Sequence, residues 1–309
     1  MATKPIAARP DLSIAPRPRL AGSTVLSDYW ALTKPDVNFL IVVTTFTGFY
    51  LARATGWRDF PFWLSINSLL GTLLVASGTG TLNQYLERRF DAQMRRTARR
   101  PLAGGRLKPV AVLRFGIALS AVGSVYLAVA VNVLASLLAM ATLLSYLFLY
   151  TPLKRWTPLC TLAGAFPGAM PPLIGWAAAS GKLNSEAWTL YAILFFWQFP
   201  HFMAIAWMYR EDYERAGYLV LPPDDSVRVR LVNLQTVLPL LALVPLSLLP
   251  GLMGDTKFYL PGALLLGAGF VYCAAQFVLH KSNSAARRLL AASIIYLPAL
   301  FVVMVLARV

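Results

Sequence analysis

The sequence predicts an all-α membrane protein, and three observations support this. Hydrophobic residues make up 58% of the 309 residues, and the mean hydropathy is +0.60. Only 13% of the residues are charged, too few to cover the surface of a soluble domain of this length. The apolar residues also form long runs without charge, such as 37–51 and 61–86. Apolar runs of about 18 residues or more are typical of membrane-spanning helices.

Nine apolar segments are long enough to cross a bilayer. We expect them at 37–53, 61–82, 110–130, 133–150, 158–179, 187–208, 231–250, 258–279 and 289–307. The division between the third and fourth segments rests on a very short turn near Val131 and Asn132. With a cytoplasmic N-terminus, 23 of the 28 Lys and Arg residues fall on the cytoplasmic side, as the positive-inside rule requires. We therefore expect a disordered cytoplasmic tail at 1–30 and a transmembrane domain at 31–309.

The formal net charge of +15 bears on the choice of partner. In a soluble chain it would suggest nucleic acid. In a membrane protein such cations fix topology and contact anionic lipid head groups, so we expect the lipid bilayer and no nucleic acid. Cys160 and Cys273 form no CxxC pair, which argues against a disulfide framework or zinc site. The N-terminal segment lacks a secretory apolar core, and its prolines argue against a mitochondrial presequence.

A first polar motif begins where the second segment leaves the hydrocarbon. Asn83, Glu87 and Asp91 recur every four residues, which places them on one face of a helix. Two carboxylates and an amide oxygen suit Mg²⁺, which prefers oxygen ligands and retains waters or substrate phosphates. Four arginines follow: Arg95, Arg96, Arg99 and Arg100. Since guanidinium groups match phosphate geometry, the motif predicts a diphosphate site. The alternative is an amphipathic loop whose acids pair with its arginines and whose arginines bind lipid phosphate.

The fourth segment ends in a second motif, YTPLKRWTP. Tyr150 and Lys154 are four residues apart at the cytoplasmic boundary, but Pro152 between them argues against a regular helical turn. Lys154 is a candidate to bind a diphosphate oxygen, and Tyr150 is a candidate to steady or protonate the leaving group. The alternative is an interfacial tyrosine beside positive-inside residues.

The sixth segment carries His201 in its apolar part, and Asp212 follows eleven residues later. An ionisable side chain inside a membrane indicates a functional site. On a continuous helix the two residues share a face about 16 Å apart, with His201 deeper in the membrane. We therefore expect Asp212 near the diphosphate and His201 near a lipophilic acceptor. The alternatives are a hydrogen bond from His201 to a carbonyl of a neighbouring helix, and pairing of Asp212 with Arg210 or Arg215.

These motifs, in this order, resemble those of the protohaem IX farnesyltransferases (haem O synthases), a family of UbiA-type intramembrane prenyltransferases. The resemblance runs from about Leu32 to the C-terminus. It rests on LTKPDVNFL, NQYLERRFDAQMRRTARRPL, YTPLKR, GAMPPLIGW and WQFPHFMAIAWMYREDYERAG. It implies that two acidic motifs on opposite halves of a helical bundle hold Mg²⁺ and the diphosphate. The first would be Asn83, Glu87 and Asp91, with Glu87 where the superfamily usually has Asp.

The second acidic motif departs further from the superfamily pattern. Quinone-type relatives carry two or more Asp there, whereas this chain offers Asp212 as the implied metal ligand. Glu211 and Glu214 are its less certain companions, and an aromatic residue or His stands where another Asp would be. This departure favours haem over an aromatic acid as acceptor. The resemblance thus implies transfer of the farnesyl group to a vinyl group of haem b, with Mg²⁺ as cofactor.

The implied setting is the inner membrane of a bacterium, with a mitochondrial inner membrane less favoured. The implied substrates are farnesyl diphosphate and haem b, and a downstream haem A synthase or the terminal oxidase assembly machinery are further partners. Two other functions stay open. One is a UbiA-type enzyme for a quinone precursor or chlorophyll-like acceptor. The other is a membrane transporter, which predicts charged residues and broken helices near the midplane, whereas nearly all ionisable groups here lie at one boundary.

Overall fold

The structure is a computed structural model that describes residues 24–53, 59–253 and 258–307. In these ranges the chain forms helices joined by turns, without a β-strand. The elements in order are α1 Val25–Leu32, α2 Pro35–Arg53, α3 Phe62–Asp91, α4 Pro109–Ala130, α5 Val133–Leu144, the π-helix η2 Ser145–Tyr150, α6 Thr151–Leu153, α7 Cys160–Gly168, α8 Met170–Ser180, α9 Ser185–Met208, α10 Arg210–Arg215, α11 Asp225–Met253, α12 Tyr259–His280 and α13 Asn283–Ala307. The predicted all-α fold is confirmed.

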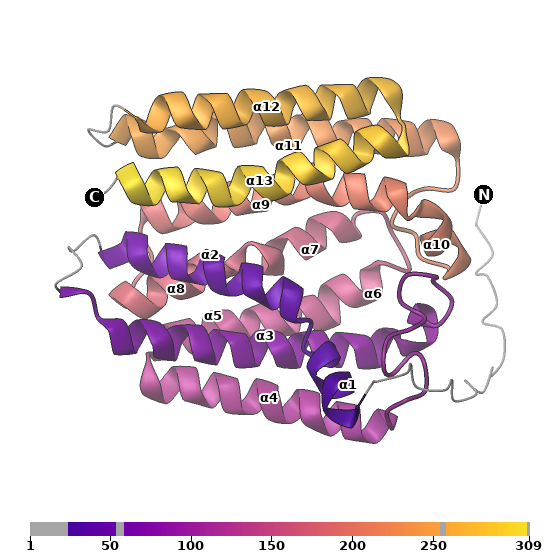
Figure 1. The fold of residues 1–309 in the computed structure, drawn as a ribbon, viewed down its shortest axis with the longest axis horizontal. Coiled ribbons are helices and arrows are strands. Elements are labelled where there is room, and N and C mark those ends of the chain that lie inside the picture. The colour runs from indigo at the N-terminus through magenta and orange to yellow at the C-terminus, as the bar shows by residue number, and fades with distance from the viewer. Residues whose placement is uncertain (1–23, 54–58, 254–257, 308–309) are drawn as a thin grey trace.

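Eight helical stretches in the described part of the chain are long and apolar enough to cross a membrane. The remaining predicted segment, 158–179, contains α7 and α8, which lie end to end within the bundle (Figure 1). Neither is long enough alone, since a crossing needs about 20 helical residues. Pro171 and Pro172 lack the N–H groups that would continue α7, so the helix breaks near Ala169. The fifth expected segment is therefore a broken helix.

The short turn between the third and fourth segments lies where the sequence predicts it. The helix α4 ends at Ala130 and α5 begins at Val133. The side chain of Asn132 caps α5 by accepting from the Ala135 N–H at 2.9 Å, and it donates to the carbonyl of Ala177 at 2.8 Å. The Asn132 side chain therefore caps the start of α5 and attaches the turn to α8.

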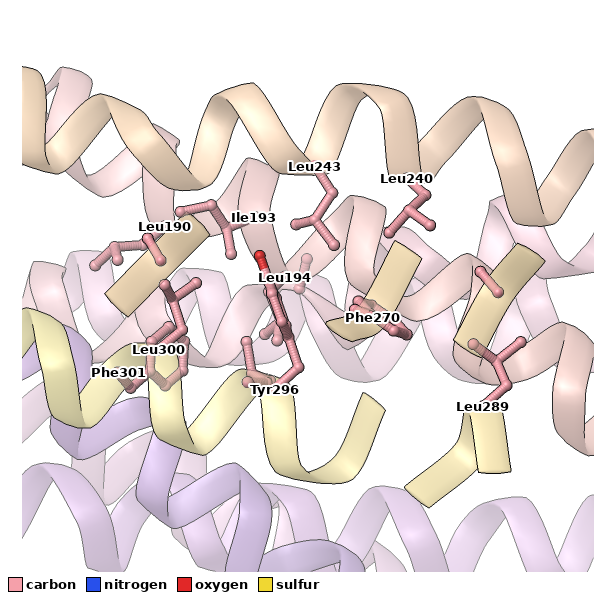
Figure 2. Close-up of a cluster of buried hydrophobic side chains, with 14 of the residues drawn as sticks. Leu190, Ile193, Leu194, Leu240, Leu243, Phe270, Leu289, Tyr296, Leu300 and Phe301 are labelled. Carbon is pink, nitrogen blue, oxygen red and sulfur yellow. The ribbon is translucent and has the colours of Figure 1, made fainter. Parts of the chain in front are cut away.

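The two largest hydrophobic clusters in the described ranges have α2 and α8 between them. The larger core joins α9, α11, α12 and α13, whose side chains meet in Figure 2. The smaller core joins α3, α4 and α5. Adjacent residues of α8 alternate between the two, since Leu173 and Trp176 lie in the larger core and Ile174 and Ala177 in the smaller. The helix α8 is therefore buried on all sides.

Glycines allow α2 and α8 to approach closely. A Cβ on Gly175 would lie 1.9 Å from the carbonyl oxygen of Thr45, and a Cβ on Gly48 would lie 2.1 Å from that of Pro172. Because these neighbours are backbone atoms, a side chain cannot be accommodated by a change of rotamer. Backbone contact through small residues is a common way for membrane helices to pack.

The N-terminal helix α1 lies at the same end of the bundle as α10 and the 92–108 loop (Figure 1). It begins at Val25, inside the segment that the sequence predicts to be a tail, and residues 1–23 of that segment lie outside the described residues. The carbonyl of Leu32 accepts hydrogen bonds from Gln84 at 3.0 Å and Thr81 at 3.4 Å. Thus α1 is attached to the end of α3, where the first polar motif lies.

We predict that Gly175→Ala destabilises the bundle, because its methyl group would overlap the Thr45 carbonyl oxygen. Overpacking of this kind costs about 1–3 kcal/mol or more. The matched control is Gly269→Ala in α12, where nothing lies within 4 Å of the added Cβ. Thermal melting in detergent should show a lower midpoint for Gly175→Ala alone. Equal midpoints for the two variants would contradict the close approach of α2 and α8.

Candidate active site

The three polar residues of the first motif share one inward face of α3. Asn83, Glu87 and Asp91 are 1%, 5% and 1% exposed. Such burial is costly for carboxylates unless each one has a partner of opposite charge. The predicted shared face is therefore present, and its charges lie inside the bundle and not at a solvated surface.

Each carboxylate of α3 contacts a cation from another part of the chain. Lys154 Nζ donates to Glu87 Oε1 at 2.8 Å, and Arg100 Nη1 donates to Asp91 Oδ2 at 2.8 Å. Lys154 follows α6, and Arg100 lies in the loop after α3. Burial alone would lower the pKa of Lys154, but the Glu87 carboxylate holds it well above its usual value. The predicted residues Lys154 and Arg100 thus meet the predicted carboxylates.

Lys34, which the sequence reasoning did not select, completes this cluster. Its Nζ donates to Asn83 Oδ1 at 2.8 Å, and Asn83 Nδ2 donates to Thr151 Oγ1 at 3.2 Å. Burial, and next the Arg100 guanidinium, lower the pKa of Lys34 to about 7. The backbone of Lys34 is in the left-handed region, with φ of 54°. This conformation is unfavourable for a residue other than glycine. Such strained residues occur often at functional sites. The only sequence feature that could have identified Lys34 is its position directly before an apolar span.

Aromatic rings surround the Lys154 ammonium group. It lies 4.4 Å from the ring centre of Tyr150 and 6.0 Å from that of Tyr218, distances that allow cation–π attraction. Tyr150 is the last residue of the π-helix η2, so the chain is not a regular α-helix here, as Pro152 predicts. Burial, and next the Glu87 carboxylate, raise the pKa of Tyr218, which keeps its hydroxyl protonated and able to donate. The sequence reasoning did not select Tyr218.

Asp212 joins this end of the bundle from the other half. It is 8% exposed on α10, where its Oδ1 accepts from Arg215 Nη1 at 2.9 Å. Its Oδ2 accepts from the backbone N–H of Arg96 at 3.3 Å, so α10 contacts the loop after α3. Of its suggested companions, Glu211 is exposed and Glu214 pairs with Arg228 at 2.7 Å. Asp212 is therefore the acidic residue of α10 that faces the loop after α3.

The four arginines predicted to bind phosphate do not point toward a common site. Arg100 points inward to Asp91, whereas Arg95 and Arg99 are exposed. The Arg96 guanidinium lies 4.9 Å from the ring centre of Tyr209. The loop that carries them is held by Arg106, whose Nη1 donates to the Arg99 carbonyl at 3.0 Å. This loop has no helical register, so the positions of its arginines could not be read from their spacing.

Arg106 also binds the loop to α1 through a mostly buried ion pair. Its Nη2 lies 2.9 Å from Asp28 Oδ1, and the two side chains are 9% and 3% exposed. A pair this well shielded is costly to break, because either partner alone would be an uncompensated charge. The sequence reasoning selected neither residue, and their separation along the chain left no local signal.

The expected shared face of His201 and Asp212 is wrong. The helix α9 ends at Met208 and α10 begins at Arg210, so the backbone at Tyr209 interrupts the helix between them. His201 instead faces α13, where its Nδ1 lies 2.8 Å from Ser293 Oγ. His201 still lies seven residues before the end of α9, roughly 10 Å deeper in the bundle. His201 therefore lies deeper than the end of α9, but it does not share a helical face with Asp212.

The α3 carboxylates fit a Mg²⁺ ion that binds together with phosphate. Asp91 Oδ1 is buried and has no hydrogen-bond partner, which leaves it free as a ligand. No group of three His, Cys, Asp or Glu residues in the described ranges is arranged to hold a metal alone. Mg²⁺ in phosphate-handling sites uses one or two carboxylates, with waters and substrate oxygens as further ligands. Two carboxylates and neighbouring cations are thus suited to a metal-bound diphosphate.

A model of the UbiA prenyltransferase family matches residues 41–302. The chain belongs to the UbiA prenyltransferase family. It is 47% identical over 290 residues to a protoheme IX farnesyltransferase from Solibacter usitatus, which covers 92% of this chain and 99% of that protein. It is 43% identical over 305 residues to a protein of the same name from Koribacter versatilis, with 95% and 96% covered. The predicted family is confirmed, and with it the class of prenyltransferase enzymes.

Solved structures of UbiA-type proteins share the fold. A digeranylgeranylglyceryl phosphate synthase structure aligns with a TM-score of 0.74 and 16% identity, covering 92% of this chain and 98% of that one. A UbiA homologue from Archaeoglobus fulgidus, bound to GPP and Mg²⁺, aligns with a TM-score of 0.62 and 15% identity, covering 90% and 99%. At these identities the comparison concerns the helical architecture.

We predict that Lys34→Met lowers the affinity for prenyl diphosphate about tenfold or more. A charge-assisted hydrogen bond contributes about 1.5–3 kcal/mol, and this cation lies beside Asn83 within the cluster. The matched control is Lys108→Met, the same change at an exposed residue at the N-terminal cap of α4. Calorimetric titration of both purified variants gives the measurement. If Lys34→Met binds as tightly as Lys108→Met, then Lys34 has no part in the site.

Proposed function

We propose that this chain transfers the farnesyl group of farnesyl diphosphate to a vinyl group of haem b, which yields haem O and diphosphate. The observation that carries the proposal is a cluster of buried, mutually neutralised charges at one end of an apolar bundle. Relatives named protoheme IX farnesyltransferase, at 47% and 43% identity over nearly the whole chain, support the acceptor and the donor.

The diphosphate end of the site would work by an exchange of ionic partners. In the structure, Lys154 and Arg100 neutralise Glu87 and Asp91. When diphosphate enters, these cations and Lys34 would turn to its oxygens. The carboxylates of α3, with Asn83 and with Asp212 from the other half, would hold Mg²⁺. Bound there, Mg²⁺ would supply positive charge to the leaving diphosphate.

The transfer itself needs an ionised donor and a shielded cation. The C1–O bond of farnesyl diphosphate breaks, and its electron pair leaves with the diphosphate, which the cations and the Tyr218 hydroxyl stabilise. The Tyr150 ring faces the Lys154 ammonium group and can likewise face an allylic cation. The vinyl π electrons then form the new C–C bond. Water adds to the resulting cation and loses a proton, which gives the hydroxyethylfarnesyl group.

The haem end of the site would lie near His201, away from the carboxylates. His201 is partly exposed in the apolar part of α9 and has no acidic partner in the described ranges. An imidazole there can ligate haem iron or take a proton from the attacking water. Both substrates are lipophilic, so they would enter from the bilayer. We place the enzyme in a bacterial inner membrane, ahead of a haem A synthase or terminal oxidase assembly that takes up the product.

We predict that membranes with the wild-type chain convert haem b and farnesyl diphosphate to a haem whose mass has increased by one farnesyl group and one hydroxyl group. Asp91→Ala should abolish this product, since it removes the proposed metal ligand and leaves Arg100 unpaired. The matched control, Asp225→Ala, removes a carboxylate that is 90% exposed and should retain the product. Mass spectrometry of the extracted haem shows which of these membranes contain the product. A prenylated quinone precursor in place of prenylated haem would reassign the acceptor.

A further inference from the structure

The imidazole of His201 is held from two directions by residues of α9 and α13. The Trp197 ring stacks on it, with ring centres 4.7 Å apart and planes 26° apart. Its Nδ1 lies 2.8 Å from Ser293 Oγ, and no hydrogen bond to Nε2 is present in the described part of the chain. The side chain is partly exposed. One ring nitrogen is therefore engaged, and the other is available to a ligand.

Ser293 fixes which nitrogen of His201 carries the proton. Its hydroxyl is fully buried and donates to the carbonyl of Leu290 at 2.6 Å, one turn earlier in α13. A hydroxyl has one proton, so once Ser293 donates to Leu290 it can only accept from His201. His201 Nδ1 must then carry hydrogen, and Nε2 presents its lone pair. The geometry selects a single tautomer of the neutral imidazole.

The same serine also holds the ring that stacks on His201. Trp197 Nε1 donates to the backbone carbonyl of Ser293 at 2.8 Å. Trp197 and His201 are one helical turn apart on α9, so both side chains meet one residue of α13. Both the tautomer and the plane of the imidazole are consequently set by contacts with Ser293.

We propose that Ser293 is a positioning residue that holds His201 in the Nδ1–H tautomer and directs Nε2 to the iron of the haem substrate. This inference rests on the proposed function and selects iron ligation from the two roles open to His201. Histidines that ligate metals almost always donate their other N–H to a fixed acceptor, and here that acceptor is Ser293 Oγ. Loss of such a partner typically lowers metal affinity about 10–100-fold.

The test is a titration of purified full-length protein with ferric haem b, followed by the Soret band and the spin state of the iron. Ser293→Ala should weaken haem binding roughly 10–100-fold. It should also shift the spectrum toward that of His201→Ala. The affinity for farnesyl diphosphate should stay at the wild-type value, because the Glu87 and Asp91 cluster is untouched.

The matched control is Ser247→Ala in α11. Ser247 is also fully buried and donates to a carbonyl one turn earlier, that of Val244 at 2.7 Å, but no histidine contacts it. This variant should bind haem with wild-type affinity and spectrum. Wild-type haem affinity and spectrum in Ser293→Ala would overturn the positioning role. That outcome leaves the proposed function standing, since the product assay tests it separately.

Discussion

The pairing of the two buried carboxylates of α3 with cations from elsewhere in the chain is the constraint on which the rest of this structure depends. Glu87 and Asp91 lie inside an apolar bundle, where an unpaired charge is costly. Lys154 must therefore approach from α6, and Arg100 must fold back from the loop. In the proposed mechanism each pair is exchanged for a metal-bound diphosphate, so the contacts that neutralise the buried charges would also prepare the site for substrate.

The fold was largely predictable because the apolar segments, and the residues that end or break them, are local features of the sequence. Eight of the nine expected segments correspond to helical stretches in the described ranges that are long and apolar enough to cross a membrane, and Pro171 and Pro172 account for the break in the fifth. The four-residue spacing of the α3 motif also predicted its shared face, because a regular helix has a fixed period. Such features need no knowledge of which helices become neighbours.

The parts of the site that escaped prediction depend on distant contacts. Lys34 and Asn83 are 49 residues apart, and Arg106 and Asp28 are 78 apart, so no spacing rule joins them. The helix break at Tyr209 has a similar cause. No proline or glycine marks it, and α10 instead turns so that Asp212 meets the backbone of Arg96. The local sequence pattern therefore predicted one continuous helix, whereas contacts with distant residues divide it into α9 and α10 at Tyr209.

The two ends of the proposed site are served by different halves of the bundle, with diphosphate at the α3 face and haem near α9 and α13. The central claim is that the α3 carboxylates take up Mg²⁺ as their cations move to diphosphate. The most direct measurement is the dissociation constant of farnesyl diphosphate with Mg²⁺ and with EDTA, in the wild type and in Glu87→Gln. We predict tight binding only for the wild type with Mg²⁺, and little effect of Mg²⁺ in Glu87→Gln. Equal affinity in Mg²⁺ and EDTA for the wild type would contradict it.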